Sequence, residues 1–190
     1  MLATLGALIL MAGLGTDPDR LADIGPAPEV RLTDQHGKTF DLASLRDKVV
    51  VVSFVYTTCY GTCPATTQAL GRVRKALAAE GLWGEKVEFV SISLDPEKDT
   101  PAVLAEYAKL QGAESEHWHF LTGPPETVRK VLGAWDMWAR RTPEGALDHP
   151  SRIFLVDPKG RQREIYSLEF LRPPTVLDDV RAVLDDRDRR

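Results

Sequence analysis

Hydrophobic residues along the chain follow two spacings, which predict a succession of strands and helices. Continuous runs of β-branched and aromatic residues, typical of strands buried on both faces of a sheet, lie at 48–56 and 87–94. Apolar residues at helical spacing predict helices at 64–82, 101–110, 125–135 and 174–184. A short strand at 118–121 is predicted between the second and third of these helices.

Two hairpins complete the predicted sheet. Residues 30–32 and 39–42 alternate around a turn that contains Gly37, and residues 152–156 and 162–166 flank a turn that contains Gly160. Strands that alternate with helices, followed by a hairpin and a last helix, predict an α/β fold. We expect a mixed central sheet with helices on both faces and an N-terminal β-hairpin, which is the thioredoxin-like order.

The first residues of the chain differ from the rest. Residues 1–16 carry no charged side chain and are mostly apolar. This run matches the roughly 7–15 apolar residues of a secretory signal and is shorter than the roughly 20 of a spanning helix. We interpret 1–16 as an apolar leader, a signal or an anchor, with a buried N-terminal helix as the alternative. Residues 17–28, rich in Pro, Gly and Asp, are predicted to be a linker before a folded domain at 29–190.

Composition narrows the class of protein. A chain of 190 residues with 43% hydrophobic residues fits a single folded domain and excludes wholesale disorder. The net charge of −4, with no extended basic stripe, argues against nucleic acid as a partner. Two cysteines are too few for the disulfide framework of a small secreted domain.

Both cysteines fall within one short segment, Cys59-Tyr60-Gly61-Thr62-Cys63. In the predicted layout Cys59 ends a buried strand and Cys63 begins a helix, at the edge where open α/β sheets place their sites. The partial positive charge of a helix N-terminus favours the thiolate at Cys63 and extends toward Cys59. Two converging thiolates can close a reversible disulfide or bind a soft metal ion.

Other interpretations of the cysteine pair are available. The two residues could be small buried hydrophobes or an inert bridge. Thioredoxin-type reductases place two residues between their cysteines, whereas this chain has three. Peroxiredoxins have Pro and Thr where Val52 and Tyr56 stand here, so a peroxidase is disfavoured.

Several segments in order resemble the SCO/SenC family of copper chaperones. The cysteine segment with the following Pro64 is similar to that family's Cys-x-x-x-Cys-Pro signature, and it is followed by similar segments at 93–101, 118–123 and 148–160. The resemblance implies a thioredoxin-like fold and one copper ion per chain, bound by Cys59, Cys63 and His149. It also implies a role in assembling the copper centre of cytochrome c oxidase, in the periplasm or on the outer face of the bacterial inner membrane. The expected partner is the copper-receiving subunit of that oxidase or another periplasmic copper protein.

The chemistry of these residue types agrees with the resemblance. Two thiolates and an imidazole suit Cu(I) and can hold Cu(II), although zinc also accepts such a set. The alternative function is a thiol-disulfide oxidoreductase that acts on cysteines of a copper-receiving partner through Cys59 and Cys63. We expect Asp95, at the end of the second buried strand, either to orient a copper ligand or to cap the turn before Pro96.

The two histidines around Trp118 have a simpler interpretation. His117 and His119 lie on one face of a short strand. We expect them to be a solvated or locally hydrogen-bonded pair rather than a second metal site.

Overall fold

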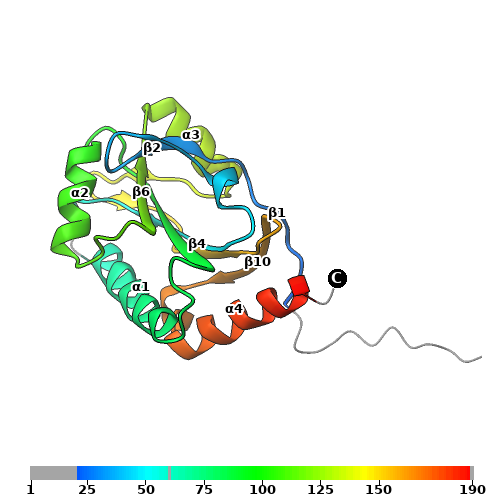
Figure 1. Cartoon of the computed structure of the whole chain (residues 1–190). Helices are drawn as coiled ribbons and strands as arrows, with labels where there is room; N and C mark the ends of the chain where they lie inside the picture. Colours follow the sequence, from blue (N-terminus) through cyan, green and yellow to red (C-terminus); the bar gives the residue numbers. More distant parts are fainter. Residues whose placement is uncertain (1–20, 60, 189–190) are drawn as a thin grey trace, which may run out of the picture.

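An eight-stranded mixed sheet forms the centre of the computed structural model, which describes residues 21–59 and 61–188 (Figure 1). The order across the sheet is β1-β10-β9-β4-β5-β6-β2-β3, and β7 and β8 pair separately. The strands are β1 (Gly25–Pro26), β2 (Arg31–Asp34), β3 (Thr39–Asp41), β4 (Val49–Val55), β5 (Val87–Ser93), β6 (Trp118–Thr122), β7 (Arg140–Arg141), β8 (Leu147–Asp148), β9 (Ile153–Val156) and β10 (Arg161–Tyr166).

The three central strands run parallel and bring their carboxyl ends to one edge. β4 pairs with β5, and β5 pairs with β6. Every residue of β4 and β5 is buried, as their continuous apolar runs predict. The buried Ser91 hydroxyl lies 2.8 Å from Ser53 Oγ and accepts a hydrogen bond of 3.0 Å from Trp118 Nε1, so these polar atoms are satisfied inside the core.

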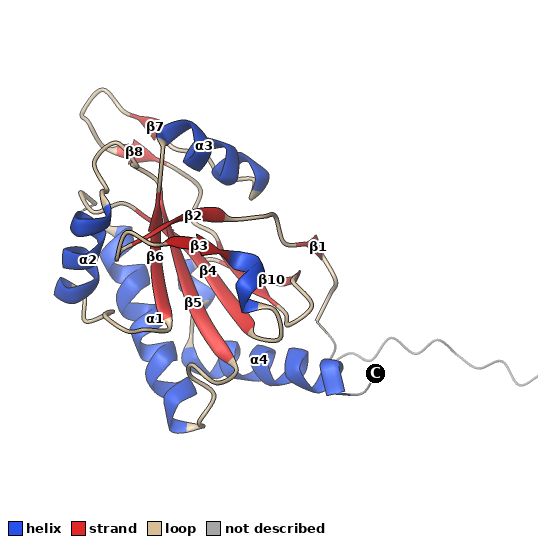
Figure 2. Ribbon diagram, turned by 45° about the horizontal axis from the view of Figure 1, so that its top comes forward, coloured by secondary structure: helices blue, strands red, loops and turns tan. Residues whose placement is uncertain are grey.

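Helices cover both faces of this sheet. α1 (Thr62–Ala79) and α4 (Pro173–Asp188) pack side by side on one face, and α2 (Pro101–Leu110) packs beside β6 (Figure 1). α3 (Pro125–Ala134) lies on the other face (Figure 2). There Trp135, directly after α3, packs edge to face on Phe54 and Phe154. Two short 3₁₀ turns lie at Leu42–Leu45 and Leu168–Phe170.

The predicted α/β fold, with its mixed sheet, helices on both faces and N-terminal hairpin, is confirmed. β2 and β3 form that hairpin, and β9 and β10 form the second one. The β7–β8 hairpin (Arg140–Asp148) was not among the predicted elements. Its strands have two residues each, too short to show a hydrophobic period.

The start of the fold differs from the prediction of a linker up to residue 28. Gly25 and Pro26 pair with β10, and the backbone N–H of Ala27 donates to Gly160 O at 2.9 Å. The predicted leader at 1–16 lies outside the described residues. Among the residues that are described, no helix is both long and apolar enough to cross a membrane.

Candidate metal centre

Cys59 and Cys63 meet at the edge formed by the carboxyl ends of the parallel strands. Cys59 follows β4, and its backbone N–H donates to Tyr56 O at 3.2 Å. Cys63 lies in the first turn of α1, which begins at Thr62. Both side chains are buried, with exposures of 9% for Cys59 and 2% for Cys63, and both are free thiols. The predicted juxtaposition of a strand end and a helix start therefore holds for both cysteines.

Cys59 is the residue whose thiolate this edge stabilises. Burial raises the pKa of Cys59, but the backbone N–H groups of Cys63 and Gly61 and the Tyr56 hydroxyl all donate hydrogen bonds to its sulfur. These donors outweigh burial, and the pKa of Cys59 lies below that of an ordinary thiol.

Cys63 behaves in the opposite way, so the expectation that the helix N-terminus favours its thiolate is wrong. Burial raises the pKa of Cys63 to about 12, and the charges of Cys59 and Asp99 act in the same direction. The backbone N–H of Tyr56 donates to Cys63 and offsets only part of this rise. The pair is therefore a stabilised thiolate beside a buried thiol, because the N–H groups at the helix start serve Cys59.

Tyr56 links the cysteines to the β7–β8 hairpin. Its hydroxyl donates to Cys59 and accepts a hydrogen bond from the backbone N–H of Leu147. Burial and the contact with Cys59 raise the pKa of Tyr56 to about 12, so it remains a hydrogen-bond donor at neutral pH. Its ring also meets the ring of His149 edge to face, with centroids 5.8 Å apart.

His149 follows β8 directly, and one of its two ring nitrogens has a hydrogen-bond partner. Its Nδ1 lies 2.8 Å from Pro150 O. A carbonyl oxygen can only accept, so Nδ1 carries the proton and Nε2 of the neutral ring has a free lone pair, as a metal ligand requires. His149 and Cys63 also line the same cavity, of about 10 Å³. The donor set of two sulfurs and one imidazole nitrogen fits copper chemically.

The three predicted ligands share an edge but do not form a closed cluster. Within 21–59 and 61–188, no three His, Cys, Asp or Glu side chains lie close enough together to hold a metal ion. A three-ligand site at this edge therefore requires the side chains of His149 and the two cysteines to come closer together than they are in this structure.

Asp95 acts through the hairpin and the turn that follows β5. Its side chain is 3% exposed, and Arg141 Nη2 donates to both carboxylate oxygens at 3.0 Å. Its carbonyl oxygen accepts from the backbone N–H groups of Lys98 and Asp99 at 2.9 and 2.8 Å. Asp95 thus closes the turn with its backbone and binds the β7–β8 hairpin with its side chain.

Sequence reasoning did not single out two residues that shape this site. One is Tyr56, which ends the buried apolar run three positions before Cys59. This position in the sequence could have indicated that Tyr56 lies near the cysteines. The other residue is Asp99, which directly precedes Thr100, the cap of α2. The side chain of Asp99 is fully buried and binds Thr57. The sequence shows that Asp99 lies four positions after Asp95, but it does not show that Thr57 is the partner of Asp99.

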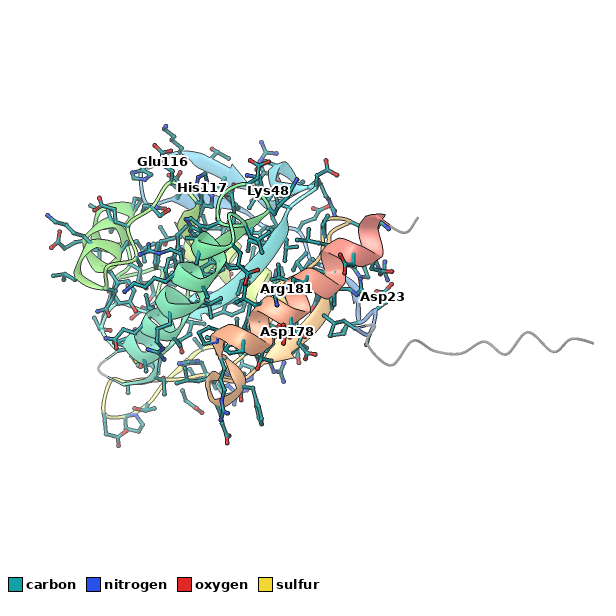
Figure 3. The ribbon with its side chains drawn as sticks, turned by 60° about the horizontal axis from the view of Figure 1, so that its bottom comes forward. Asp23, Lys48, Glu116, His117, Asp178 and Arg181 are labelled. Carbon is teal, nitrogen blue, oxygen red and sulfur yellow. The ribbon has the colours of Figure 1, made fainter. Side chains whose placement is uncertain are left out.

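The two histidines around Trp118 both contact Glu88 of β5, and His119 is hydrogen-bonded to it. His119 Nε2 lies 2.8 Å from Glu88 Oε2, and His117 Nδ1 lies 3.5 Å from Glu88 Oε1. Lys48 binds the same carboxylate, and Figure 3 shows Lys48 and His117 close together at one end of the molecule. This cluster lies at the amino ends of β4 and β5, opposite the cysteines.

Comparisons with known proteins agree with this arrangement. A family model described as SCO1/SenC matches residues 23–185. The SCO1 protein homolog of Bacillus subtilis is 30% identical over 153 residues, which cover 78% of each chain. The structure of Bradyrhizobium japonicum ScoI with copper bound superposes with a TM-score of 0.68 at 29% identity, covering 86% of this chain and 98% of that one.

A third comparison concerns the cysteines. BsSco is described as a member of the Sco family of cytochrome c oxidase assembly proteins in which a disulfide switch was identified. It superposes with a TM-score of 0.75 at 25% identity, covering 86% of this chain and 97% of the other. The family model spans most of the chain, and the Bacillus subtilis relative matches it at 30% identity, so this protein belongs to the SCO1/SenC family.

Proposed function

We propose that this protein binds one copper ion through Cys59, Cys63 and His149 and delivers it to the copper-receiving subunit of cytochrome c oxidase. The observation that carries the proposal is that three soft or borderline donors lie at one edge of the sheet, where Cys63 contacts Cys59 and shares a cavity with His149. Two reduced cysteines lie there beside an imidazole whose Nε2 is left free by the Nδ1 contact with Pro150 O. The copper-bound ScoI structure and the oxidase-assembly role given for BsSco support the choice of metal and recipient.

Delivery requires that copper passes from the ligands of this protein to those of a recipient. The thiolate of Cys59 is stabilised by N–H and O–H donors, and copper can move by exchange of such thiolates between donor and recipient. Asp95 supports this site from the turn after β5.

Copper titration of the reduced protein tests the proposed ligands. Wild-type protein should bind one copper ion per chain, and oxidation to the Cys59–Cys63 disulfide should abolish binding because it removes two ligands. His149→Ala should weaken binding of Cu(II) more than of Cu(I), since two thiolates can retain the softer ion. Undiminished copper binding by the oxidised protein, or unchanged Cu(II) affinity in His149→Ala, would contradict the ligand set.

A second candidate function is thiol-disulfide exchange with a partner, favoured by the opposed pKa shifts of the two cysteines. The Cys59 thiolate attacks a partner disulfide, forms a mixed disulfide and releases one partner thiolate. Cys63, once deprotonated, then attacks the Cys59 sulfur and releases the second partner thiolate. The partner gains two electrons, and Cys59 and Cys63 are left as a reversible disulfide.

A deletion strain separates the two functions. If delivery of copper dominates, oxidase activity should return with added copper, and His149→Ala should fail to restore it at low copper. If reduction of a partner dominates, His149→Ala should complement the deletion and added copper should have no effect.

The proposed location is the periplasm or the outer face of the bacterial inner membrane, reached through the leader at 1–16. The absence of charged residues in this run supports that proposal. Fusion of residues 1–28 to a reporter that is active only outside the cytoplasm should give a signal, and an inactive fusion would argue against export.

A further inference from the structure

The turn between β5 and α2 makes hydrogen bonds to both segments that carry the proposed copper ligands, which we call the two arms of the site. One arm is the segment from Thr57 to Cys63, and the other is the β7–β8 hairpin that leads to His149. We propose that Asp95 and Arg141 are positioning residues, which set the hairpin, and with it His149, relative to the cysteines. This inference rests on the proposed copper site and adds two residues that do not touch the metal.

The contact on the hairpin side joins one buried carboxylate to one guanidinium. Arg141 Nη2 lies 3.0 Å from each carboxylate oxygen of Asp95, which is 3% exposed. Arg141 Nη1 donates to Gly145 O at 3.1 Å, so the same side chain also closes the loop of the hairpin. Charge-assisted hydrogen bonds with one buried partner are among the stronger polar contacts in proteins. Arg141 therefore stabilises the loop of the hairpin and also holds the hairpin against the turn after β5.

The contact on the cysteine side is made by Asp99. Its Oδ1 accepts from Thr57 Oγ1 at 2.6 Å and from Thr57 N at 3.2 Å. Its Oδ2 accepts from Ser93 Oγ at 2.6 Å, and the side chain is fully buried. Thr57 stands two positions before Cys59, so Asp99 fixes the start of the cysteine segment against the end of β5.

The two carboxylates belong to one closed turn. The backbone N–H of Asp99 donates to Asp95 O at 2.8 Å, and the backbone N–H of Asp95 donates to Ser93 Oγ at 3.0 Å. The cysteine segment and the β7–β8 hairpin are thus both hydrogen-bonded to this turn. The distance between His149 and the cysteines therefore depends on the Asp95–Arg141 contact. Residues that hold metal ligands in position typically contribute about 10- to 100-fold to metal affinity.

The hairpin supplies a matched control for Arg141. The neighbouring Arg140 is also exposed, but its guanidinium lies over the Trp138 ring, 4.8 Å from the centroid. Arg140→Met thus removes the same charge from the same strand without touching Asp95. Arg141→Lys keeps a charge toward Asp95 and loses the hydrogen bond to Gly145 O. Asp95→Asn keeps the shape of the side chain and removes its charge.

The experiment has a metal-free arm and a copper arm, both on the reduced full chain. Without metal, hydrogen exchange at the hairpin amides of Thr142 and Gly145 should be faster in Arg141→Met than in wild type and unchanged in Arg140→Met. With copper, Cu(II) affinity should fall about 10- to 100-fold in Arg141→Met and Asp95→Asn and less in Arg141→Lys. The thiolate-to-Cu(II) charge-transfer band should shift, while Cu(I) affinity changes less.

The outcomes separate this inference from the proposed function. Wild-type Cu(II) affinity and an unshifted band in Arg141→Met would overturn the positioning role and leave the copper site standing. Unchanged hairpin exchange in that variant would overturn it as well. Failure of His149→Ala to weaken Cu(II) binding in the wild-type background would instead overturn the proposed ligand set. If Arg141→Met does not fold, Arg141→Lys and Asp95→Asn decide the question by the same two readouts.

Discussion

At the scale of single residues, the two cysteines differ in proton affinity although only three residues separate them. Cys59 receives hydrogen bonds from two backbone N–H groups and the Tyr56 hydroxyl, whereas burial dominates at Cys63. The Cys59 thiol therefore loses its proton more readily than the Cys63 thiol, and Cys63 stays protonated until its environment changes.

Alkylation should reveal this difference. Iodoacetamide at pH 7 should modify Cys59 at least about tenfold faster than Cys63, because only the thiolate reacts. Tyr56→Phe should raise the pKa of Cys59 by removing a donor to its thiolate, and should slow its labelling at pH 7. Peptide mass spectrometry over a pH series measures both effects.

A buried tyrosine on α2 serves as the control. The Tyr107 hydroxyl lies 2.9 Å from Thr67 Oγ1. Tyr107→Phe therefore also deletes a buried hydroxyl, but not one that donates to Cys59, and it should leave the order of labelling unchanged. Faster labelling of Cys63 than of Cys59 would contradict the assignment.

The sequence predicted the positions of the cysteines well and their proton affinities poorly. A strand end and a helix start can be located from hydrophobic spacing, and this places Cys59 and Cys63 together. Which sulfur the helix N–H groups reach, and how deeply Cys63 is buried, depends on the packing of the whole edge. The same holds for Asp99, whose partner Thr57 is distant in sequence.

At the scale of elements, the amino ends of β4, β5 and β6 are joined around one carboxylate. Glu88 is buried, with a side chain 6% exposed, and binds Lys48 and His119. Burial by itself would raise the pKa of Glu88, but these two partners lower it to about 2. The charged form of Glu88 is therefore favoured in the folded protein and stabilises the contact between the strands.

Acid should weaken this contact in a defined range of pH. Because the folded-state pKa of about 2 lies below the ordinary value of 4.5, the stabilisation is complete above pH 4.5 and is lost as the pH falls toward 2. Glu88→Gln should lower the free energy of unfolding by about 3 kcal/mol at pH 7 and by much less near pH 2. Urea unfolding at several pH values measures the difference.

Glu85 provides the comparison for this variant. Its side chain is 75% exposed and lies 3.9 Å from Lys86, so Glu85→Gln should change stability by less than about 1 kcal/mol at any pH. An equal effect of the two substitutions at pH 7 would remove Glu88 from the stabilising contacts.

Long elements were predicted and short ones were not, for a physical reason. β4, β5 and the four helices contain enough residues to show a hydrophobic period. β1, β7 and β8 have two residues each and depend on contacts with other parts of the fold, as Arg141 of β7 contacts Asp95 after β5. Their formation depends on tertiary contacts that a local pattern does not contain.

At the scale of the whole molecule, Arg163 of β10 joins the start of the described chain to α4. Its guanidinium donates to Leu21 O at 2.8 Å and to Ala22 O at 2.9 Å, and it also binds Asp157 and Asp186. Its side chain is 5% exposed, so this is a buried charge whose partners come from three segments of the chain.

Removal of this charge should destabilise the domain as a whole. Arg163→Met leaves the buried Asp157 without its partner guanidinium and should lower the free energy of unfolding by about 3–5 kcal/mol. Arg161→Met breaks the exposed contact with Asp23 and should cost less than about 1 kcal/mol. Chemical denaturation measures both variants, and comparable losses would show that Arg163 is not the joining residue.

The position of β1 has a mechanical consequence. β1 pairs with the start of β10, beside the amino end of β4, whereas the cysteines follow the carboxyl end of β4. A pull on residue 21 therefore acts first on the hydrogen bonds that Arg163 donates to Leu21 O and Ala22 O, and then on the backbone hydrogen bonds between the edge strand β1 and β10. The turn that holds the cysteines and the hairpin lies at the opposite end of the parallel strands. An attachment through the residues before 21 would therefore act on the end of the sheet opposite the predicted copper ligands.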